Sequence, residues 1–390
     1  MKSPRNLFSM CFSQFGSSFS GNFVNVFLPF YILKVSPYPL KQTLIWTGFI
    51  MGSTSLCASI TATFWGALTH RFSPKLLFLR TFLVNTLALL LMGFTTNLYL
   101  LLLLRVLQGF CAGTSTIGLI IVSSTSSKER LSSDLGLYQS SMTLGQLIGP
   151  FLGSLGAVSV GYRGAFISAS AVLFSSFLFC YLFVPNVERL PRRGASLSRI
   201  SIDKNILIAW IACFIATIQL TFLPSILPNV FEKFHIERTV ALKSAGMVVM
   251  LYTATAMIGT YVWSRISKRY GLIRMITVLF VGGILTQILL ALAGEIVGFT
   301  LIRMIQTGMI AATFPLVISI FAAESRGGII GFLNSGRFAG NALGPIIATS
   351  ILAYFNLSSL FFFIAALSFL LVLALQIFLK EKDIHVAAGF

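Results

Sequence analysis

Charged residues are scarce in this sequence of 390 residues, and acidic residues are the scarcest of them. Charged side chains make up 10% of the chain, and only ten of them are aspartate or glutamate. A soluble domain usually carries roughly 25% charged residues, so water cannot solvate most of this chain. The shortage argues against a soluble catalytic domain, and we expect a protein that is not an enzyme.

Cysteine and histidine are also few. The cysteines are odd in number and lie in apolar runs, which argues against a disulfide framework. The three histidines, His70, His235 and His385, are far apart in the sequence. The sequence therefore predicts no metal site and no cofactor.

Apolar residues dominate instead, at 56% of the chain. A membrane helix needs about 20 apolar residues, so a chain of this length with short turns holds about twelve such helices. Lipid offers no partner for an open sheet edge, so every span is predicted to be helical. The predicted spans cover residues 8–33, 43–68, 76–95, 98–122, 135–159, 164–185, 205–230, 243–265, 275–293, 296–321, 328–354 and 358–379.

Lysine and arginine outnumber the acids and give a formal net charge of +18. They are scattered through short loops without forming a basic helix face, so the sequence does not predict nucleic-acid binding. With the N-terminus inside, the predicted cytoplasmic segments hold nineteen of these residues and the outer segments hold six. This asymmetry predicts a multi-pass protein of the cell (inner) membrane with both termini in the cytoplasm.

The sequence divides into two related halves. The longest polar stretch, residues 186–204, is predicted to be a cytoplasmic linker between six-helix bundles at 1–185 and 205–380, with a cytoplasmic tail at 381–390. Several identities recur at a spacing of 198 residues, and they include rare tryptophan and intramembrane arginine positions. The pairs are Gly48 and Gly246, Trp65 and Trp263, Arg71 and Arg269, Arg105 and Arg303, and Gln108 and Gln306. Six spans repeated in one orientation indicate parallel halves.

Two stretches half a chain apart combine regularly spaced glycines with a proline. Residues four apart share one helix face, and glycines there leave a groove that a second backbone can approach. Proline removes a hydrogen bond and bends the helix. The residues are Gly145, Gly149, Pro150 and Gly153 in the fifth span, and Gly336, Gly340, Gly344 and Pro345 in the eleventh.

Three segments resemble motifs of the major facilitator superfamily, especially of its twelve-span drug and metabolite antiporters. Residues 65–75 read W-G-A-L-T-H-R-F-S-P-K and resemble the family's loop pattern G-x-L-a-D-R-x-G-R-K between spans 2 and 3. Residues 103–113 read L-L-R-V-L-Q-G-F-C-A-G and resemble its span 4 pattern R-x-x-Q-G-x-x-x-G. Residues 144–153 resemble the G-P-x-x-G motif of exporters. The resemblance implies an all-α membrane protein with 12 transmembrane helices in two pseudo-symmetric six-helix bundles.

The resemblance also implies gating residues. The loop motif places Gly66, His70 and Arg71 at a cytoplasmic latch, but the acidic residue of the family falls on His70, so the latch must differ here. Asp134 or Glu324 could replace that acid; alternatively, the loop's basic residues only fix the topology. The family further implies that the glycines and Pro150 of span 5 pack against span 8, and that the glycines and Pro345 of span 11 pack against span 2.

Three arginines lie well inside predicted spans, away from the span ends. A charge in a span costs a few kcal/mol on insertion scales and is a functional hypothesis by default. For Arg105 and its repeat partner Arg303 the resemblance implies a role in coupling or in linking cavity and gate, while hydrogen bonding to helix carbonyls is the structural alternative. For Arg337 two roles remain as alternatives, contact with the solute and a structural role in the gate.

By the same resemblance, spans 1, 4, 7 and 10 line a central cavity. The candidate solute contacts are Asn22, Asn25, Arg105, Gln108, Gln219, Arg303, Gln306 and Arg337. Thr217, Thr221, Thr307 and Phe314 are further candidates, with interhelical hydrogen bonding or packing as the alternative for each. Pro29, Pro224, Pro228 and Pro315 are predicted to break or bend these helices.

The expected function is secondary active transport of a small organic solute by alternating access, as an exporter or antiporter of drugs or metabolites. The alternatives are uptake of an anionic nutrient or a siderophore-like metal chelate, and a non-transporting membrane sensor. All ten acidic residues lie at span ends or in loops, so no carboxylate is predicted inside the cavity. The sequence therefore does not decide whether transport is coupled to a proton or to another ion. The expected partners are the solute and the lipid bilayer, and the expected state is a monomer.

Overall fold

Helices make up nearly all of the part of the chain that the structure describes. A computed structural model describes residues 4–127, 130–184, 203–321 and 327–378. Within these ranges it contains fifteen α-helices, one 3-10 turn (η1, Leu68–His70) and no strand. The α-helices are α1 Pro4–Val35, α2 Leu40–Ala67, α3 Pro74–Met92, α4 Leu98–Phe110, α5 Thr114–Thr125, α6 Leu131–Ser159, α7 Gly161–Phe183, α8 Lys204–Thr221, α9 Leu223–Lys233, α10 Arg238–Tyr270, α11 Leu272–Leu292, α12 Ile296–Ile310, α13 Thr313–Phe321, α14 Gly327–Tyr354 and α15 Leu357–Phe378.

Nine helical segments among the described residues are long and apolar enough to cross a membrane. Two of these segments join successive helices, α4 with α5 and α12 with α13. Helices α1, α6 and α14 are not among the nine, although they contain 32, 29 and 28 residues. They carry the glycines and polar residues that lower mean hydropathy. Together these elements are consistent with the twelve predicted spans.

Three of the predicted spans are interrupted rather than continuous. Span 7 breaks at Phe222, two residues before Pro224, and span 10 breaks before Pro315. Span 4 breaks between α4 and α5 without any proline, where Gly113 adopts a φ of +132°. Only glycine takes this backbone conformation readily, so the third break depends on Gly113. Pro29 and Pro228 lie inside helices that continue through them.

Short polar side chains fix two of the helix starts. Asn97 Oδ1 accepts hydrogen bonds from the backbone N–H groups of Tyr99 and Leu100, over 2.9 and 3.3 Å. Asp203 Oδ1 accepts one from the N–H of Ile206 over 2.8 Å. Because the first N–H groups of a helix have no internal partner, these caps define where α4 and α8 begin.

Contacts divide the chain into two compact units, which we describe separately. As far as the structure describes them, unit 1 holds residues 1–39, 49–194 and 237–250, and unit 2 holds the remainder. Helices α2 and α10 each contribute residues to both units. The predicted linker lies almost wholly, and the tail entirely, outside the described residues, so the predicted bundle boundaries stay a prediction.

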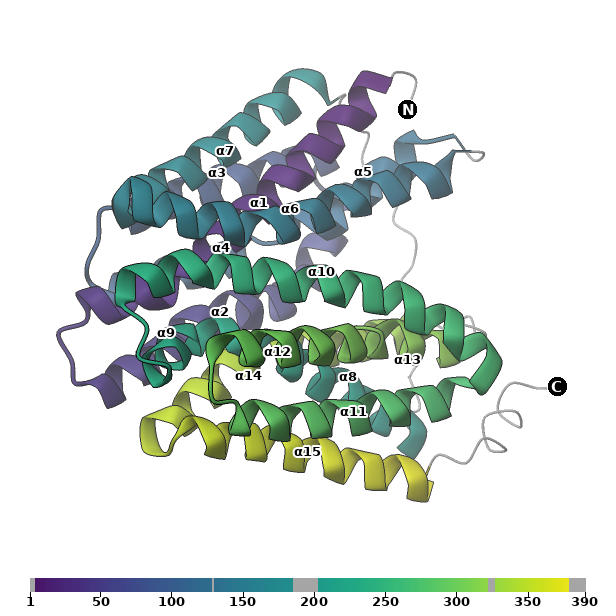
Figure 1. Cartoon of the computed structure of the whole chain (residues 1–390). Helices are drawn as coiled ribbons and strands as arrows, with labels where there is room; N and C mark the ends of the chain where they lie inside the picture. Colours follow the sequence, from purple (N-terminus) through teal and green to yellow (C-terminus); the bar gives the residue numbers. More distant parts are fainter. Residues whose placement is uncertain (1–3, 128–129, 185–202, 322–326, 379–390) are drawn as a thin grey trace. The chain divides into compact units, whose positions relative to one another are not determined.

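In unit 1, α1 packs along α6 and also contacts α7, as can be followed in Figure 1. Phenylalanine rings at four-residue spacing run along α1, with centroids 5.5 Å apart between Phe19 and Phe23 and 6.1 Å apart between Phe23 and Phe27. Lipid is as apolar as such a core, so close packing rather than the hydrophobic effect holds these helices together.

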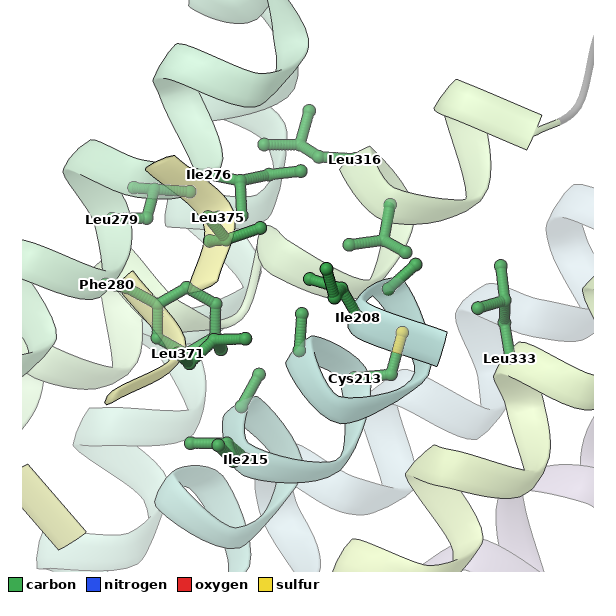
Figure 2. Packing of buried hydrophobic residues seen from close by; sticks show 14 of the residues in the cluster. Ile208, Cys213, Ile215, Ile276, Leu279, Phe280, Leu316, Leu333, Leu371 and Leu375 are labelled. Atoms are coloured by element: carbon green, nitrogen blue, oxygen red, sulfur yellow. The ribbon is translucent and has the colours of Figure 1, made fainter. Parts of the chain in front are cut away.

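In unit 2, the buried apolar core lies between α8, α11 and α15, with α13 and α14 closing its sides. Figure 2 shows Ile208 and Ile215 of α8 on the side of Phe280 of α11 and Leu371 of α15, and Cys213 of α8 on the side of Leu333 of α14. These side chains are at most 7% exposed. The core fixes α8 against α11 and α15, and thereby positions the polar end of α8 that is described below.

Candidate functional site

A first polar cluster lies in unit 1, where α4 contacts α1. Arg105 Nη2 donates to Asn25 Oδ1 over 2.8 Å. The Arg105 and Gln108 side chains are 5% and 6% exposed. They are three positions apart in the sequence and therefore share one face of α4. Among the described residues, Arg105 Nε and Gln108 Oε1 have no hydrogen-bond partner. The cluster therefore offers one open donor and one open acceptor to a polar ligand.

Asn22, which was predicted beside Asn25, makes a different contact. Its Nδ2 donates to the Ser18 carbonyl one turn earlier in α1, over 2.8 Å. A bond of this kind satisfies the amide within its own helix. Asn22 is thus one turn away from the Arg105 contact and is not joined to it.

A second polar cluster lies in unit 2 and joins α12 to α8. Arg303 is 0% exposed. Its Nη1 donates to the Gln219 carbonyl over 2.8 Å and its Nη2 donates to the Leu220 carbonyl over 3.0 Å. Gln306 Oε1 accepts from the same guanidinium, and Gln306 Nε2 donates to Gln219 Oε1 over 3.2 Å. Three of the predicted residues are therefore brought together.

Arg337 and the predicted threonines make more local contacts. The Arg337 guanidinium carbon lies 4.6 Å from the centre of the Phe314 ring on α13, which is within cation–π distance. Thr217 and Thr221 each donate to a carbonyl four residues earlier in α8, over 2.7 and 2.8 Å. Thr307 does the same to the Arg303 carbonyl. Thr307 Oγ1 also lies 3.0 Å from the Tyr252 carbonyl oxygen of α10, and solute contact by these threonines stays a prediction.

The break in span 4 has polar partners that sequence reasoning missed. Trp65 Nε1 donates to the Phe110 carbonyl over 2.6 Å, and Arg80 Nη2 donates to the Cys111 carbonyl over 3.2 Å. The Arg80 guanidinium carbon lies 3.3 Å from the centre of the Trp65 ring. Both side chains satisfy carbonyls that the end of α4 leaves without a helical donor.

The partner predicted for the glycine faces is wrong, although their predicted function as a groove is supported by the packing. A Cβ added at Gly149 would lie 2.8 Å from the Phe19 carbonyl oxygen, and one at Gly153 would lie 2.1 Å from that of Phe23. Both neighbours belong to α1, the first span, and not to the eighth span. A glycine groove is filled by the backbone of the neighbouring helix, so it does not require any particular residue type in that helix.

The second glycine face repeats this arrangement in unit 2. A Cβ at Gly336 would lie 2.8 Å from the Trp210 carbonyl oxygen, and one at Gly340 would lie 2.7 Å from that of Phe214. Both neighbours belong to α8, so the predicted contact of these glycines with the second span is also wrong. The first and seventh spans are repeat-related, and each fills the groove of its own unit.

The two prolines of the same predicted sets do meet the predicted spans: Pro150 lies against Gly246 of the eighth span, and the Pro345 carbonyl oxygen would lie 3.2 Å from a Cβ at Gly48 of the second span. In unit 1, a Cβ at Gly246 of α10 would lie 2.4 Å from the Pro150 carbonyl oxygen and 2.0 Å from Ser154 Oγ. In unit 2, a Cβ at Gly48 of α2 would lie 2.1 Å from Thr349 Oγ1. The close approach therefore uses glycines of α10 and α2, and these two are the repeat pair Gly48 and Gly246.

The loop motif is only partly described. Arg71 follows the η1 turn and is exposed, and Asp134 in the first turn of α6 is 8% exposed. Nothing is described of the Gly66 and His70 side chains, and Glu324 lies outside the described residues. The altered latch stays a prediction.

Comparisons with known proteins agree with the helical architecture. A sequence model of the Major Facilitator Superfamily matches residues 10–306 and 209–388. The chain is 26% identical to the uncharacterized MFS-type transporter YuxJ of Bacillus subtilis (strain 168), over 97% of this chain and 100% of that protein. It is 25% identical to the multidrug resistance protein MdtG of Klebsiella pneumoniae (strain 342), over 89% of this chain and 86% of that protein.

Two solved structures share the fold at low sequence identity. The nucleoside transporter NupG superposes with a TM-score of 0.77 at 14% identity, over 96% of this chain and 98% of NupG. The human organic anion transporter MFSD10 superposes with a TM-score of 0.69 at 16% identity, over 96% of this chain and 100% of that chain. Likeness at this level of identity concerns the fold alone.

Proposed function

Because the chain belongs to the major facilitator superfamily and is a membrane transporter, we propose that it exports a small organic solute by alternating access. One observation carries the proposal: the chain resembles proteins named multidrug resistance protein MdtG over about nine-tenths of its length. The glycine and proline pattern of α6 supports the same direction, since it resembles the exporter motif. Drugs and endogenous metabolites are the proposed solutes, and exchange for a proton or another ion is the proposed coupling.

The proposed solute contact is the cluster at Arg105. Its open Nε donor and the open Gln108 Oε1 acceptor lie one turn apart on α4, and both side chains are almost fully buried. Buried polar groups need partners, so a polar solute that supplied an acceptor and a donor would satisfy both. Asn25 holds the guanidinium in place from α1. Asn22 is proposed as a more distant contact of the same solute, and Arg337 is proposed as a solute contact within unit 2.

A second candidate function is uptake of an anionic nutrient or metal chelate. Within the part of the chain that the structure describes, the oxygens that accept hydrogen bonds from Arg105 and Arg303 are amide and carbonyl oxygens, none from a carboxylate. A guanidinium without a carboxylate is a ready site for an anion. Vesicle orientation distinguishes the two functions, and a sensor would give no flux in either.

Solute accumulation in oriented membrane vesicles tests the proposal. We expect inverted vesicles to accumulate a polar drug that carries hydrogen-bond donors and acceptors, such as chloramphenicol, when a proton gradient is applied. Right-side-out vesicles should accumulate none. Accumulation of an organic anion such as fluorescein in right-side-out vesicles alone would favour uptake. Absence of flux of any solute under any gradient would favour the sensor.

Replacing Arg105 with glutamine should lower the transport rate at least tenfold. The substitution keeps a polar head but removes the charge and the fork of donors that spans Asn25 and the open position. We expect most of the loss in the apparent KM for the transported probe. Arg163→Gln is the matched control, because Arg163 is exposed and its guanidinium carbon lies 4.1 Å from the centre of the Phe94 ring. Equal rates in Arg105→Gln and wild type would leave Arg105 as a packing residue.

The placement in the cell is part of the proposal. We place both termini in the cytoplasm of the inner membrane, with residues 186–204 as a cytoplasmic linker and the protein as a monomer. The ratio of basic residues between the two predicted sides supports this orientation. Protease digestion of right-side-out vesicles should then leave the linker uncut, whereas digestion of inverted vesicles should cut it.

A further inference from the structure

The end of α8 contains a backbone carbonyl that its own helix cannot satisfy. Helix α8 ends at Thr221 and α9 begins at Leu223. In a continuous helix the Leu220 carbonyl would accept from residue 224, but that residue is proline and has no N–H. In lipid an unsatisfied carbonyl costs several kcal/mol, so a donor must come from elsewhere.

Arg303 supplies that donor. Its two terminal nitrogens donate to the adjacent carbonyls of Gln219 and Leu220, over 2.8 and 3.0 Å. The planar guanidinium presents parallel N–H groups, which suits two neighbouring acceptors. These carbonyls form the negative end of the α8 dipole, so the cation is favoured there electrostatically as well.

Aromatic rings complete the surroundings of this charge. The Arg303 guanidinium carbon lies 4.9 Å from the centre of the Phe222 ring and 5.0 Å from that of Tyr252. The side chain is fully buried, so these π faces and carbonyl dipoles replace water around it. The contacts bind the charge to the helix break and leave Nε as its open donor.

The guanidinium also sets the direction of a hydrogen-bond chain. Arginine only donates, so Gln306 must accept with Oε1 and donate with Nε2 to Gln219 Oε1. Gln219 Nε2 must then donate to Ser368 Oγ, over 2.7 Å, and Ser368 donates to the Ile364 carbonyl over 2.8 Å. One donor-only head therefore orients two amides and ties α12, α8 and α15 together.

The repeat-related Arg105 makes a different contact. Asn25 is also four residues before a proline, Pro29, but α1 continues through that proline without a break. Arg105 reaches the Asn25 side chain and not the backbone carbonyls. The two arginines thus occupy matching positions in the repeat, and only Arg303 binds a helix break.

We propose that Arg303 is a positioning residue: it replaces the backbone donor that Pro224 withholds and, through Gln306, orients Gln219. Arg303 and Pro224 act as one unit that holds the break in the seventh span. The inference does not depend on the solute or the direction proposed above, because its primary readout is the stability of the purified protein.

A double-mutant cycle between Arg303 and Pro224 tests this pairing. Arg303→Gln should lower Tm by about 4 °C, because two buried carbonyls lose their donors. Pro224→Ala returns an N–H to the Leu220 carbonyl, so Arg303→Gln in that background should lower Tm by less than half as much. Equal losses in both backgrounds would overturn the proposal. Arg105→Gln is the matched control, and its effect should not change with Pro224→Ala.

Two further variants keep the test decisive. If Arg303→Gln does not fold, the proposal requires that the double variant with Pro224→Ala can be purified. Arg303→Lys keeps the charge but not the forked pair of N–H donors. It should lower Tm by less than Arg303→Gln does. In transport of chloramphenicol or fluorescein, Arg303→Gln should reduce the maximal rate and leave KM within twofold. A raised KM with unchanged Tm would instead make Arg303 a solute contact and overturn the proposal.

Discussion

Replacing Gly153 with leucine is expected to abolish transport and to destabilise unit 1. A Cβ at this position would lie 2.1 Å from the Phe23 carbonyl oxygen and 2.8 Å from the Phe23 Cα. Both atoms belong to the backbone of α1, which cannot turn aside as a side chain does, so α1 and α6 must separate along their shared length. Transport in proteoliposomes should fall below a tenth of the wild-type rate, and the Tm of purified protein should fall.

The same helix provides the control. A Cβ at Gly136 of α6 would meet no described atom within 4 Å, so Gly136→Leu should leave both the rate and Tm close to wild type. Gly340→Leu and Gly331→Leu form the corresponding pair on α14, since Gly340 lies against α8 and a Cβ at Gly331 would meet none of the described residues. Normal transport by Gly153→Leu would mean that the α1–α6 approach is not needed for function.

The helical architecture could be predicted from the sequence because spanning a membrane is a property of one segment at a time. An apolar run of sufficient length needs no information about its neighbours. The partner of a glycine face is a property of two segments. The face of α6 predicts a groove, but α1 enters it with the backbone of Phe19 and Phe23. The small residues around Phe19, in the run 16–21, do not by themselves select this helix over the other helices that carry small residues. Thus the groove was predictable and its occupant was not.

The polar site was predictable to a similar degree. Arg105 and Arg303 were evident because a charge within an apolar span is rare. Arg80, near the start of the predicted span 76–95, was not among the candidate residues, yet it binds the Cys111 carbonyl at a break in span 4. That break has no proline to signal it and depends on the positive φ of Gly113. Since the break creates the need for a donor, a residue that fills the need cannot be recognised before the break is known.

Replacing Gly246 with leucine is expected to stop transport while leaving the α1–α6 packing intact. Gly246 lies on α10, which belongs to the predicted C-terminal half, and it approaches α6 of the predicted N-terminal half within unit 1. A Cβ there would lie 2.0 Å from Ser154 Oγ and 2.4 Å from the Pro150 carbonyl oxygen. Ser154 Oγ also lies 3.3 Å from the Lys243 carbonyl oxygen, so the contact extends over one turn of α10. Leucine would prevent this contact from forming.

The effect should concern a conformational step more than the fold. By the proposed orientation, this contact closes the outer side of the protein, and alternating access requires that it form and break. We expect the rate in proteoliposomes to fall at least tenfold, backbone hydrogen exchange of residues 238–250 to rise, and Tm to change little. Met247→Leu is the matched control, because Met247 is the next residue of α10 and is 50% exposed. A Gly246→Leu protein with wild-type flux and unchanged exchange would show that transport does not require the contact. A fall in Tm as large as that of Gly153→Leu would instead make the contact part of the permanent fold.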